Sequence, residues 1–213
     1  MKVIRRPARG AAVRKAVEAL RAADPRLGEI IARAGPCRIE GRRDPFVALA
    51  EAIIYQQLSM KAAETIWGRF ERLFDGRKVS PQAVIDLHPT RLRSAGVSRQ
   101  KGRYLRALAR GARDKALDVR RLRRMGDDEI IQDLMQLPGI GRWSVEMFLI
   151  FCLKRPDVWP VGDLGLLKAL QRMFGMRRLP SRERALALGE RWRPYRSIAT
   201  WYLWRSTDSG GVG

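Results

Sequence analysis

Hydrophobic residues recur along the chain at intervals of three and four positions, which is the spacing of an α-helix. The segment 45–56 is a clear case, because one helical face carries Phe46, Leu49, Ile53 and Ile54. Asp44 and Pro45 precede it, and this pair is typical of a helix that begins with an N-cap followed by a proline at its first position. The pattern therefore predicts a helix that starts at residue 45.

The same reasoning predicts helices over most of the remaining chain. The helix after Ser59 carries an apolar stripe of Ala63, Ile66, Trp67, Phe70 and Leu73. Ser80, Thr90 and Ser98 are further candidate N-caps. Other helices are expected over residues 98–108, 127–136, 142–153, 163–174, 181–191 and 194–204.

The alternating pattern of strands is nearly absent. We therefore expect an all-α protein of two helical lobes with a central cleft. A helical segment, 1–40, should pack on a core of 41–205, and the tail 206–213, with the sequence "STDSGGVG", should be disordered.

One turn interrupts this helical pattern in an unusual way. Residues 137–148 read "LPGIGRWSVEMF", so a proline and two glycines stand directly before the most apolar helix. Pro138 should end the preceding helix, and Gly139 and Gly141 permit a tight turn and the close approach of another backbone. The helix that follows would present its first N–H groups to an anion. An ordinary helical hairpin without a ligand is the alternative.

Asp163 stands in a second notable stretch, "VGDLGLL", about two dozen residues after the glycine turn. It follows an extended loop rich in proline, "KRPDVWPVGD", at the point where a helix should begin. A carboxylate at this position accepts backbone N–H bonds and stays ionised. Taken alone, Asp163 is most simply an N-cap.

The charge balance indicates what kind of anion the turn binds. The 213 residues contain 43 Lys and Arg against 22 Asp and Glu, a formal net charge of +21. Such an excess points to a polyanionic partner, most simply DNA, although a GC-rich genome that inflates arginine usage would contribute. Two cysteines and one histidine are too few for a zinc site or a four-cysteine iron–sulfur cluster. Cys37 and Cys152 are expected to be free thiols, and no segment has the roughly 18 consecutive apolar residues of a membrane span.

Together, these motifs resemble the helix–hairpin–helix DNA glycosylase superfamily, and within it the 3-methyladenine DNA glycosylase II branch. Three more stretches agree with the resemblance: "IIYQQLSMKAAETIW", "AGVSRQKGRYLRALA" and "ERWRPYRSIATWYLW". The resemblance implies a hydrolase that flips an alkylated purine, of the 3-methyladenine or 7-methylguanine type, out of double-stranded DNA. It would then hydrolyse the N-glycosidic bond and leave an abasic site for base excision repair.

By resemblance, Asp163 is the catalytic carboxylate that stabilises the developing sugar cation and orients or deprotonates the attacking water. Superfamily members that also cut the strand place a nucleophilic lysine where this chain has Trp143. We therefore expect a monofunctional enzyme without lyase activity. It should need no cofactor for catalysis and should contain no iron–sulfur cluster.

The resemblance also assigns binding residues. The base pocket would be lined by Trp143, Trp204, Tyr55 and Met147, with Trp201 and Tyr202 as weaker candidates. Backbone contacts to DNA would come from Gly139, Gly141 and Ser144, and on the other lobe from Ser98 and Lys101. Carbonyl groups of Met135, Leu137 and Ile140 would hold a structural Na⁺ or K⁺. Gln57 stands where relatives place the wedge that fills the gap in the duplex, and Leu58 is either an alternative wedge or a core residue.

The chain departs from long family members in one respect, because only about forty residues precede the helical core and they do not read as an N-terminal β lobe. We expect a monomer in the cytoplasm, associated with the nucleoid and not with membranes. The main alternative is a non-catalytic helix–hairpin–helix DNA-binding module. A glycosylase for oxidised pyrimidines that also has lyase activity, and a basic RNA-binding protein, explain fewer of the motifs.

Overall fold

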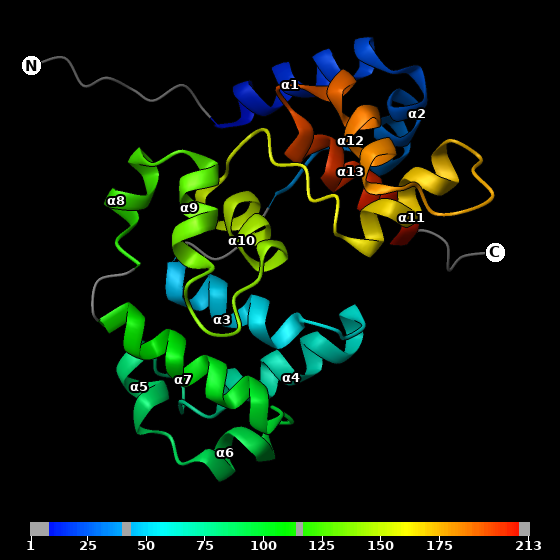
Figure 1. Ribbon diagram of the computed structural model, residues 1–213. Coiled ribbons are helices and arrows are strands. Elements are labelled where there is room, and N and C mark those ends of the chain that lie inside the picture. The colour runs from blue at the N-terminus through cyan, green and yellow to red at the C-terminus, as the bar shows by residue number, and fades with distance from the viewer. Residues whose placement is uncertain (1–8, 40–43, 114–116, 209–213) are drawn as a thin grey trace, which may run out of the picture. The chain divides into compact units, whose positions relative to one another are not determined.

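The structure, a computed structural model, describes residues 9–39, 44–113 and 117–208. The chain divides into two compact units (Figure 1). Unit 1 joins residues 1–39 to residues 155–213, and unit 2 comprises residues 40–154. The described residues form helices and turns without a strand, which confirms the all-α fold class. The central cleft stays a prediction.

Helix α3, Pro45–Tyr55, is the element around which unit 2 is organised. It packs against α4, α7 and α10, and α7 in turn packs against α5 and α6 (Figure 1). These arrangements bury both faces of α3, which explains why its sequence is apolar nearly all round. The other helical elements of this unit are α4 (Met60–Arg72), α5 (Pro81–Asp86), α6 (Pro89–Ser94), α7 (Arg99–Arg113), α8 (Val119–Arg124), α9 (Asp127–Leu134), α10 (Arg142–Phe148) and the π-helical turn η1 (Leu149–Leu153).

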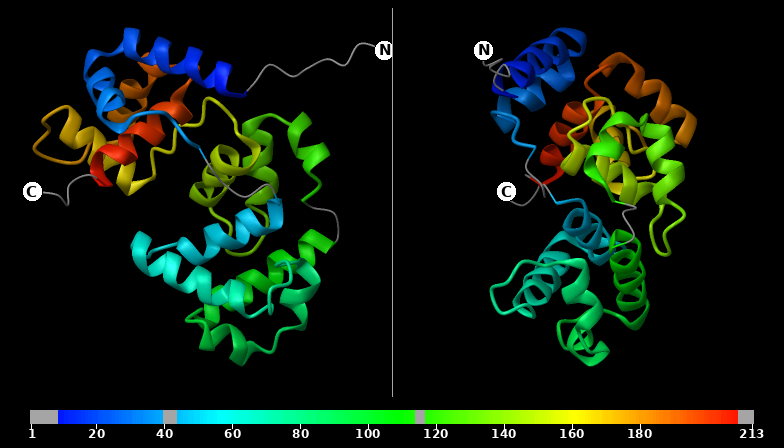
Figure 2. Two further views of the ribbon diagram at one scale, coloured as in Figure 1. Left: turned by 180° about the vertical axis from the view of Figure 1, so that it is seen from behind. Right: turned by 90° about the vertical axis from the view of Figure 1, so that its left-hand side faces the viewer.

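Helix α13, Arg196–Asp208, has the same role in unit 1. It packs against α11, α2 and α1, and the two further views of Figure 2 show α13 beside these helices. The remaining elements of this unit are α1 (Arg9–Ala23), α2 (Pro25–Ala34), α11 (Leu164–Met173), α12 (Arg182–Gly189) and the 3₁₀ turn η2 (Glu190–Trp192). Helix α13 continues three residues into the segment 206–213 for which we expect disorder, and residues 209–213 lie outside the described part.

Local capping determines where several helices begin. The carboxylate of Asp44 accepts the Val47 N–H at 3.1 Å, and the hydroxyls of Ser59, Ser80 and Ser98 accept backbone N–H groups in the same way. These predicted caps are confirmed. The prediction for Thr90 is wrong, because α6 begins at Pro89, two residues earlier than a cap at Thr90 would place it, and the ring of His88 accepts the Thr90 N–H. Pro89 at the first helical position moves the cap to the residue before it.

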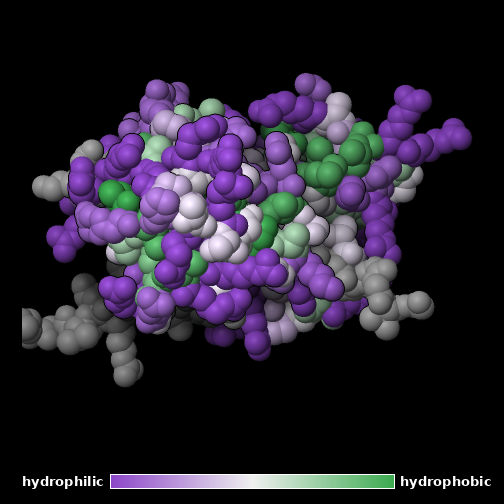
Figure 3. All heavy atoms as spheres, turned by 90° about the horizontal axis from the view of Figure 1, so that it is seen from below, coloured by the Kyte–Doolittle hydropathy of each residue, from purple (hydrophilic) through white to green (hydrophobic). Residues whose placement is uncertain are grey.

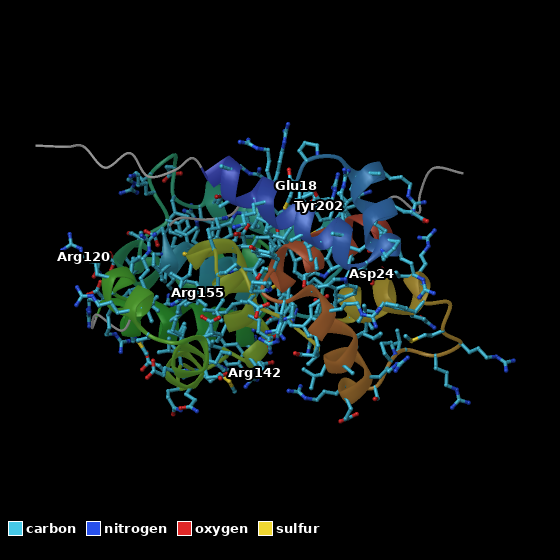
Figure 4. The ribbon with its side chains drawn as sticks, turned by 90° about the horizontal axis from the view of Figure 1, so that it is seen from above. Glu18, Asp24, Arg120, Arg142, Arg155 and Tyr202 are labelled. Atoms are coloured by element: carbon cyan, nitrogen blue, oxygen red, sulfur yellow. The ribbon has the colours of Figure 1, made fainter. Side chains whose placement is uncertain are left out.

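Tyr202 belongs to the core of unit 1. Its ring is fully buried among residues of α1, α2 and α13, and its hydroxyl donates to the Gly35 carbonyl at 3.0 Å (Figure 4). Burial raises the pKa of this phenol to about 12. Its proposed place in a base pocket is therefore wrong, because a side chain enclosed in this way has no face left for a ligand.

Residues at the start of α13 form hydrogen bonds to the loop that precedes Asp163. Arg196 is nearly buried, and its Nε and Nη2 donate to the two carboxylate oxygens of Asp157 at 2.7 and 2.9 Å. Next to it, the Ser197 hydroxyl donates to the Arg155 carbonyl and accepts the Val158 N–H. These bonds satisfy the polar groups of an irregular segment, and thereby fix the path of the chain toward α11.

The surface matches the composition. Figure 3 shows one face, on which hydrophilic residues predominate and smaller hydrophobic areas lie between them. Arg120 on α8 is an example of the exposed arginines (Figure 4). In the part of the chain that the structure describes, no helix has the length and apolar character needed to cross a membrane.

Candidate active site

Asp163 lies at the N-terminus of α11, as predicted, and a second residue holds its carboxylate. Its Oδ1 accepts the Leu166 N–H at 2.6 Å, which makes it the N-cap. The same Oδ1 accepts the indole Nε1–H of Trp204 at 2.7 Å. Two donors on one carboxylate oxygen fix the orientation of the group. The bond also orients Trp204, which is half-buried on α13.

Both partners come from elements that are fixed by packing within unit 1. Helix α11 carries Asp163 and α13 carries Trp204, and these two helices pack directly against each other. Leu166, Ala169 and Leu170 bury the inner face of α11 in the core that also contains Leu203. The geometry of the carboxylate and the indole is therefore determined by a helix–helix contact and not by a loop.

In unit 2, the predicted hairpin is present between α9 and α10. Gly139 adopts φ +84°, which non-glycine residues rarely do. A Cβ at this position would also lie 2.1 Å from Cγ of Tyr104 on α7, so the ring packs directly on the turn. Gly141 differs, because its φ is −98° and a Cβ there would meet no atom within 4 Å. Nothing among the described residues requires glycine at 141.

Gln56 attaches the hairpin to α3, and the sequence analysis missed this role. Its Nε2 donates to the Gly139 carbonyl and to the Ser144 hydroxyl, both at 2.9 Å. Ser144 is buried, so its side chain serves this contact, and a phosphate would meet only its backbone N–H. Gln56 is the residue directly before Gln57 and Leu58, which form the candidate wedge turn. It therefore links the hairpin to this turn. In the sequence, only the presence of two adjacent glutamines indicated a polar role at this position.

The candidate wedge turn is exposed. Gln57 adopts φ +56°, a left-handed conformation that projects it from the end of α3, and it is exposed to solvent. Leu58 follows with 38% of its surface exposed. The interpretation of Leu58 as a core residue is therefore wrong. Both side chains remain candidates for the wedge.

The predicted aromatic and sulfur-containing pocket residues of unit 2 are Tyr55, Trp143 and Met147, and all three are half-buried. A half-buried side chain keeps part of its surface accessible, as a residue that contacts a base must. Trp201 of unit 1 is also half-buried, but it packs edge-on against Tyr202, and the guanidinium of Arg205 lies over its ring at 5.9 Å.

Ser98 and Lys101 were predicted to contact DNA from the lobe opposite the hairpin, and this placement is wrong, because both lie in unit 2 together with Gly139. Both residues have structural roles. Ser98 caps α7 through the Lys101 N–H. Lys101 directs its ammonium at the end of α3, where Nζ donates to the carbonyls of Ile54 and Gln56 at 2.8 Å each. Burial lowers the pKa of this ammonium. Lys101 thereby supports the segment that carries Gln56 and Gln57.

The two cysteines are free thiols, as predicted. Burial raises the pKa of each thiol to about 11. Among the described residues, no group of three or more His, Cys, Asp or Glu side chains could hold a metal ion.

Comparison with known proteins identifies the family. Residues 50–194 match the HhH-GPD superfamily of base excision DNA repair proteins. DNA-3-methyladenine glycosylase 1 of Schizosaccharomyces pombe is 32% identical over 184 residues, which are 85% of this chain and 81% of that protein. The solved structure of 3-methyladenine DNA glycosylase from the same organism, in complex with abasic DNA, has a TM-score of 0.85 at 30% identity and covers 93% of this chain and 99% of that chain. The solved structure of DNA-3-methyladenine glycosidase from Bacillus halodurans has a TM-score of 0.75 at 34% identity, and it covers 90% of this chain and 88% of that chain. This chain belongs to the HhH-GPD superfamily of base excision DNA repair proteins.

Proposed function

We propose that this protein is a monofunctional DNA glycosylase that removes alkylated purines from duplex DNA. One observation carries the proposal: Asp163, at the motif position of the family's catalytic carboxylate, is held by the indole of Trp204 at 2.7 Å. A capping role alone requires only the Leu166 N–H. The additional bond places the carboxyl group and an aromatic ring side by side.

The chemistry that this pair supports is cleavage of an N-glycosidic bond. An alkylated purine carries positive charge, so it departs with the bonding electrons without a strong general acid. Positive charge then develops on the sugar, and the Asp163 carboxylate stabilises it electrostatically. The same carboxylate orients or deprotonates a water molecule that attacks the anomeric carbon. The products are the free base and an abasic site.

The indole of Trp204 contributes in two ways. Its N–H keeps the carboxylate in place, and its face can stack on a cationic base, a cation–π contact of about 0.5–2 kcal/mol. Trp143, Tyr55 and Met147 are proposed as further contacts to the base. Because Trp143 has no nucleophile, no Schiff base forms at this position and the strand stays intact.

Double-stranded DNA is the proposed partner, bound by the protein as a monomer. The net charge of +21 favours it over a neutral ligand. The hairpin residues Gly139, Gly141 and Ser144 are proposed to donate backbone N–H bonds to phosphates. The open space above Gly141 supports this, since a phosphate could approach its backbone closely.

A monovalent cation at the hairpin is compatible with the turn. The Leu137 carbonyl accepts the Ile140 N–H at 3.1 Å, and a carbonyl oxygen has a second lone pair for a cation. We propose that Met135, Leu137 and Ile140 hold Na⁺ or K⁺ through their carbonyls. Such an ion would add positive charge next to a bound phosphate. Asp163 needs no metal for its role.

The direct test is release of bases from methylated duplex DNA by the purified protein, measured by liquid chromatography. We expect 3-methyladenine or 7-methylguanine in solution, strands that break only after alkali treatment, and no covalent adduct with borohydride. Binding of the duplex without base release would contradict the proposal and favour a non-catalytic module. A trapped adduct would contradict the monofunctional mechanism.

A further inference from the structure

Gly165 is the second residue of α11, two positions after Asp163, and its backbone does not require glycine. The φ angle of Gly165 is not positive, so another residue could adopt the same backbone conformation. Alanine is favoured over glycine inside helices, so helix propensity alone would select a larger residue here. The reason for glycine must therefore lie in what surrounds the position.

The surroundings are the two site residues themselves. A Cβ at 165 would lie 3.1 Å from Asp163 Oδ1, 3.2 Å from Trp204 Cδ1 and 3.4 Å from Trp204 Nε1. Asp163 Oδ1 is the acceptor of the 2.7 Å hydrogen bond, Trp204 Nε1 is its donor, and Cδ1 is the ring atom bonded to Nε1. Ordinary carbon contacts are 3.5–4.0 Å, so an added methyl group would displace one partner by a few tenths of an ångström.

We propose that Gly165 is a positioning residue for the catalytic carboxylate. The missing side chain lets the indole edge of Trp204 lie against the first turn of α11. Only at this approach does the Nε1–H reach Asp163. The inference rests on the proposed function for its effect on catalysis, whereas its geometric part stands on the contact between α11 and α13.

The chain offers a matched control in Gly162, which lies just before Asp163. A Cβ there would meet no atom within 4 Å, and its φ is not positive. Gly162→Ala thus makes the same chemical change next to the same carboxylate, without the contact. Comparing Gly165→Ala with Gly162→Ala separates the contact with Trp204 from a general effect of stiffening the backbone.

The first measurement is the indole N–H resonance of Trp204 in a ¹⁵N-correlated spectrum, assigned with Trp204→Phe. We expect Gly165→Ala to shift this resonance in the direction that Asp163→Asn shifts it, and Gly162→Ala to leave it unchanged. This readout does not depend on activity. An unmoved resonance in Gly165→Ala would overturn the inference, even for a protein that proves to be an active glycosylase.

The second measurement is the single-turnover rate of base release under saturating enzyme, beside the Kd for abasic duplex DNA and the melting temperature. Gly165→Ala should lower the rate at least tenfold, because catalytic groups tolerate little misplacement. Its Kd should stay within twofold, and its melting temperature should not fall. Gly162→Ala should match the wild type. If the resonance shifts but the rate does not change, the positioning role is refuted.

A double variant covers the case in which Gly165→Ala does not fold. Trp204→Ala removes the N–H and both ring atoms, Cδ1 and Nε1, that the methyl group would meet. In that background, Gly165→Ala should fold and cost no further activity, since contacting residues are not additive. Independent losses in the double variant, or failure of the double variant to fold, would overturn the inference. Absence of base release by the wild type would instead refute the proposed function, and the resonance test would still apply.

Discussion

Replacing Arg196 should destabilise unit 1 far more than replacing its neighbour Arg193, although both bind the same carboxylate. The side chain of Arg196 is 9% exposed and forms a two-pronged pair with Asp157, with a third bond from Nη2 to the Asp157 carbonyl at 3.1 Å. Arg193 donates to Asp157 at 2.9 Å, but half of its side chain is exposed. A comparison of the Arg196 and Arg193 variants therefore separates the effect of burial from the effect of the contact with Asp157.

The magnitude follows from this difference in burial. Removing one partner of a buried ion pair costs about 3–5 kcal/mol when the other charge stays buried without compensation. For Arg196 this value is an upper bound, because Asp157 is 22% exposed and keeps its bond to Arg193. A solvent-screened surface pair contributes about 0–1 kcal/mol. For a chain of this size, 1 kcal/mol corresponds to about 2–4 °C in melting temperature. Arg196→Met should then lower the melting temperature of the chain by up to about 20 °C, and Arg193→Met by at most about 4 °C.

Differential scanning calorimetry at neutral pH and moderate salt measures both variants, with urea unfolding as the check on reversibility. The reasoning is refuted if the two variants lose the same small amount of stability. It is also refuted if Asp157→Asn, which retains the shape of the partner, destabilises no more than Arg193→Met. Either result would mean that the loop before Asp163 does not depend on the start of α13.

Three further predictions concern other parts of the chain. Gly139→Ala should disrupt the hairpin and weaken binding of duplex DNA at least tenfold, because Gly139 has φ +84° and a Cβ there would meet the Tyr104 ring. Gly141→Ala should keep the fold, since a Cβ there meets no atom within 4 Å. Equal thermal stability of the two variants would contradict this prediction. The thiols of Cys37 and Cys152, with pKa values of about 11, should alkylate slowly at pH 8 in the native protein. Because these folded-state pKa values exceed those of an unfolded chain, their contribution to stability is complete below about pH 8.5 and is lost as the pH rises toward 11; a urea midpoint that does not fall over this range would argue against it. Gln57→Ala should slow excision from duplex DNA more than from a single strand, and a larger effect of Leu58→Ala would identify Leu58 as the wedge instead.

The sequence predicted what depends on neighbouring residues. Helix starts at Asp44, Ser59 and Asp163 follow from a capping side chain and the N–H group three positions later. The hairpin between α9 and α10 likewise follows from its proline and glycines. The error at Thr90 is also local, because the His88 ring caps α6 with Pro89 at the first position.

Contacts between distant segments escaped prediction. The bonds from Gln56 to Gly139 and from Arg196 to Asp157 join residues 83 and 39 positions apart, and polar residues of these types are usually exposed. The pocket role of Tyr202 and the core interpretation of Leu58 were wrong for the same reason. Periodicity shows that a helix has an apolar face, but only packing shows whether a given ring lies in the core or at a site.

The central claim is that the carboxylate of Asp163 performs the chemistry, and Asp163→Asn tests it most directly. Asparagine keeps an oxygen that can accept the Leu166 and Trp204 N–H groups, so the fold should persist. The measurement is the single-turnover rate of methylated-base release, beside the Kd for abasic duplex DNA. We predict a rate at least 100-fold below that of the wild type with a Kd within a few fold. Near-normal release of the base by Asp163→Asn would contradict the account.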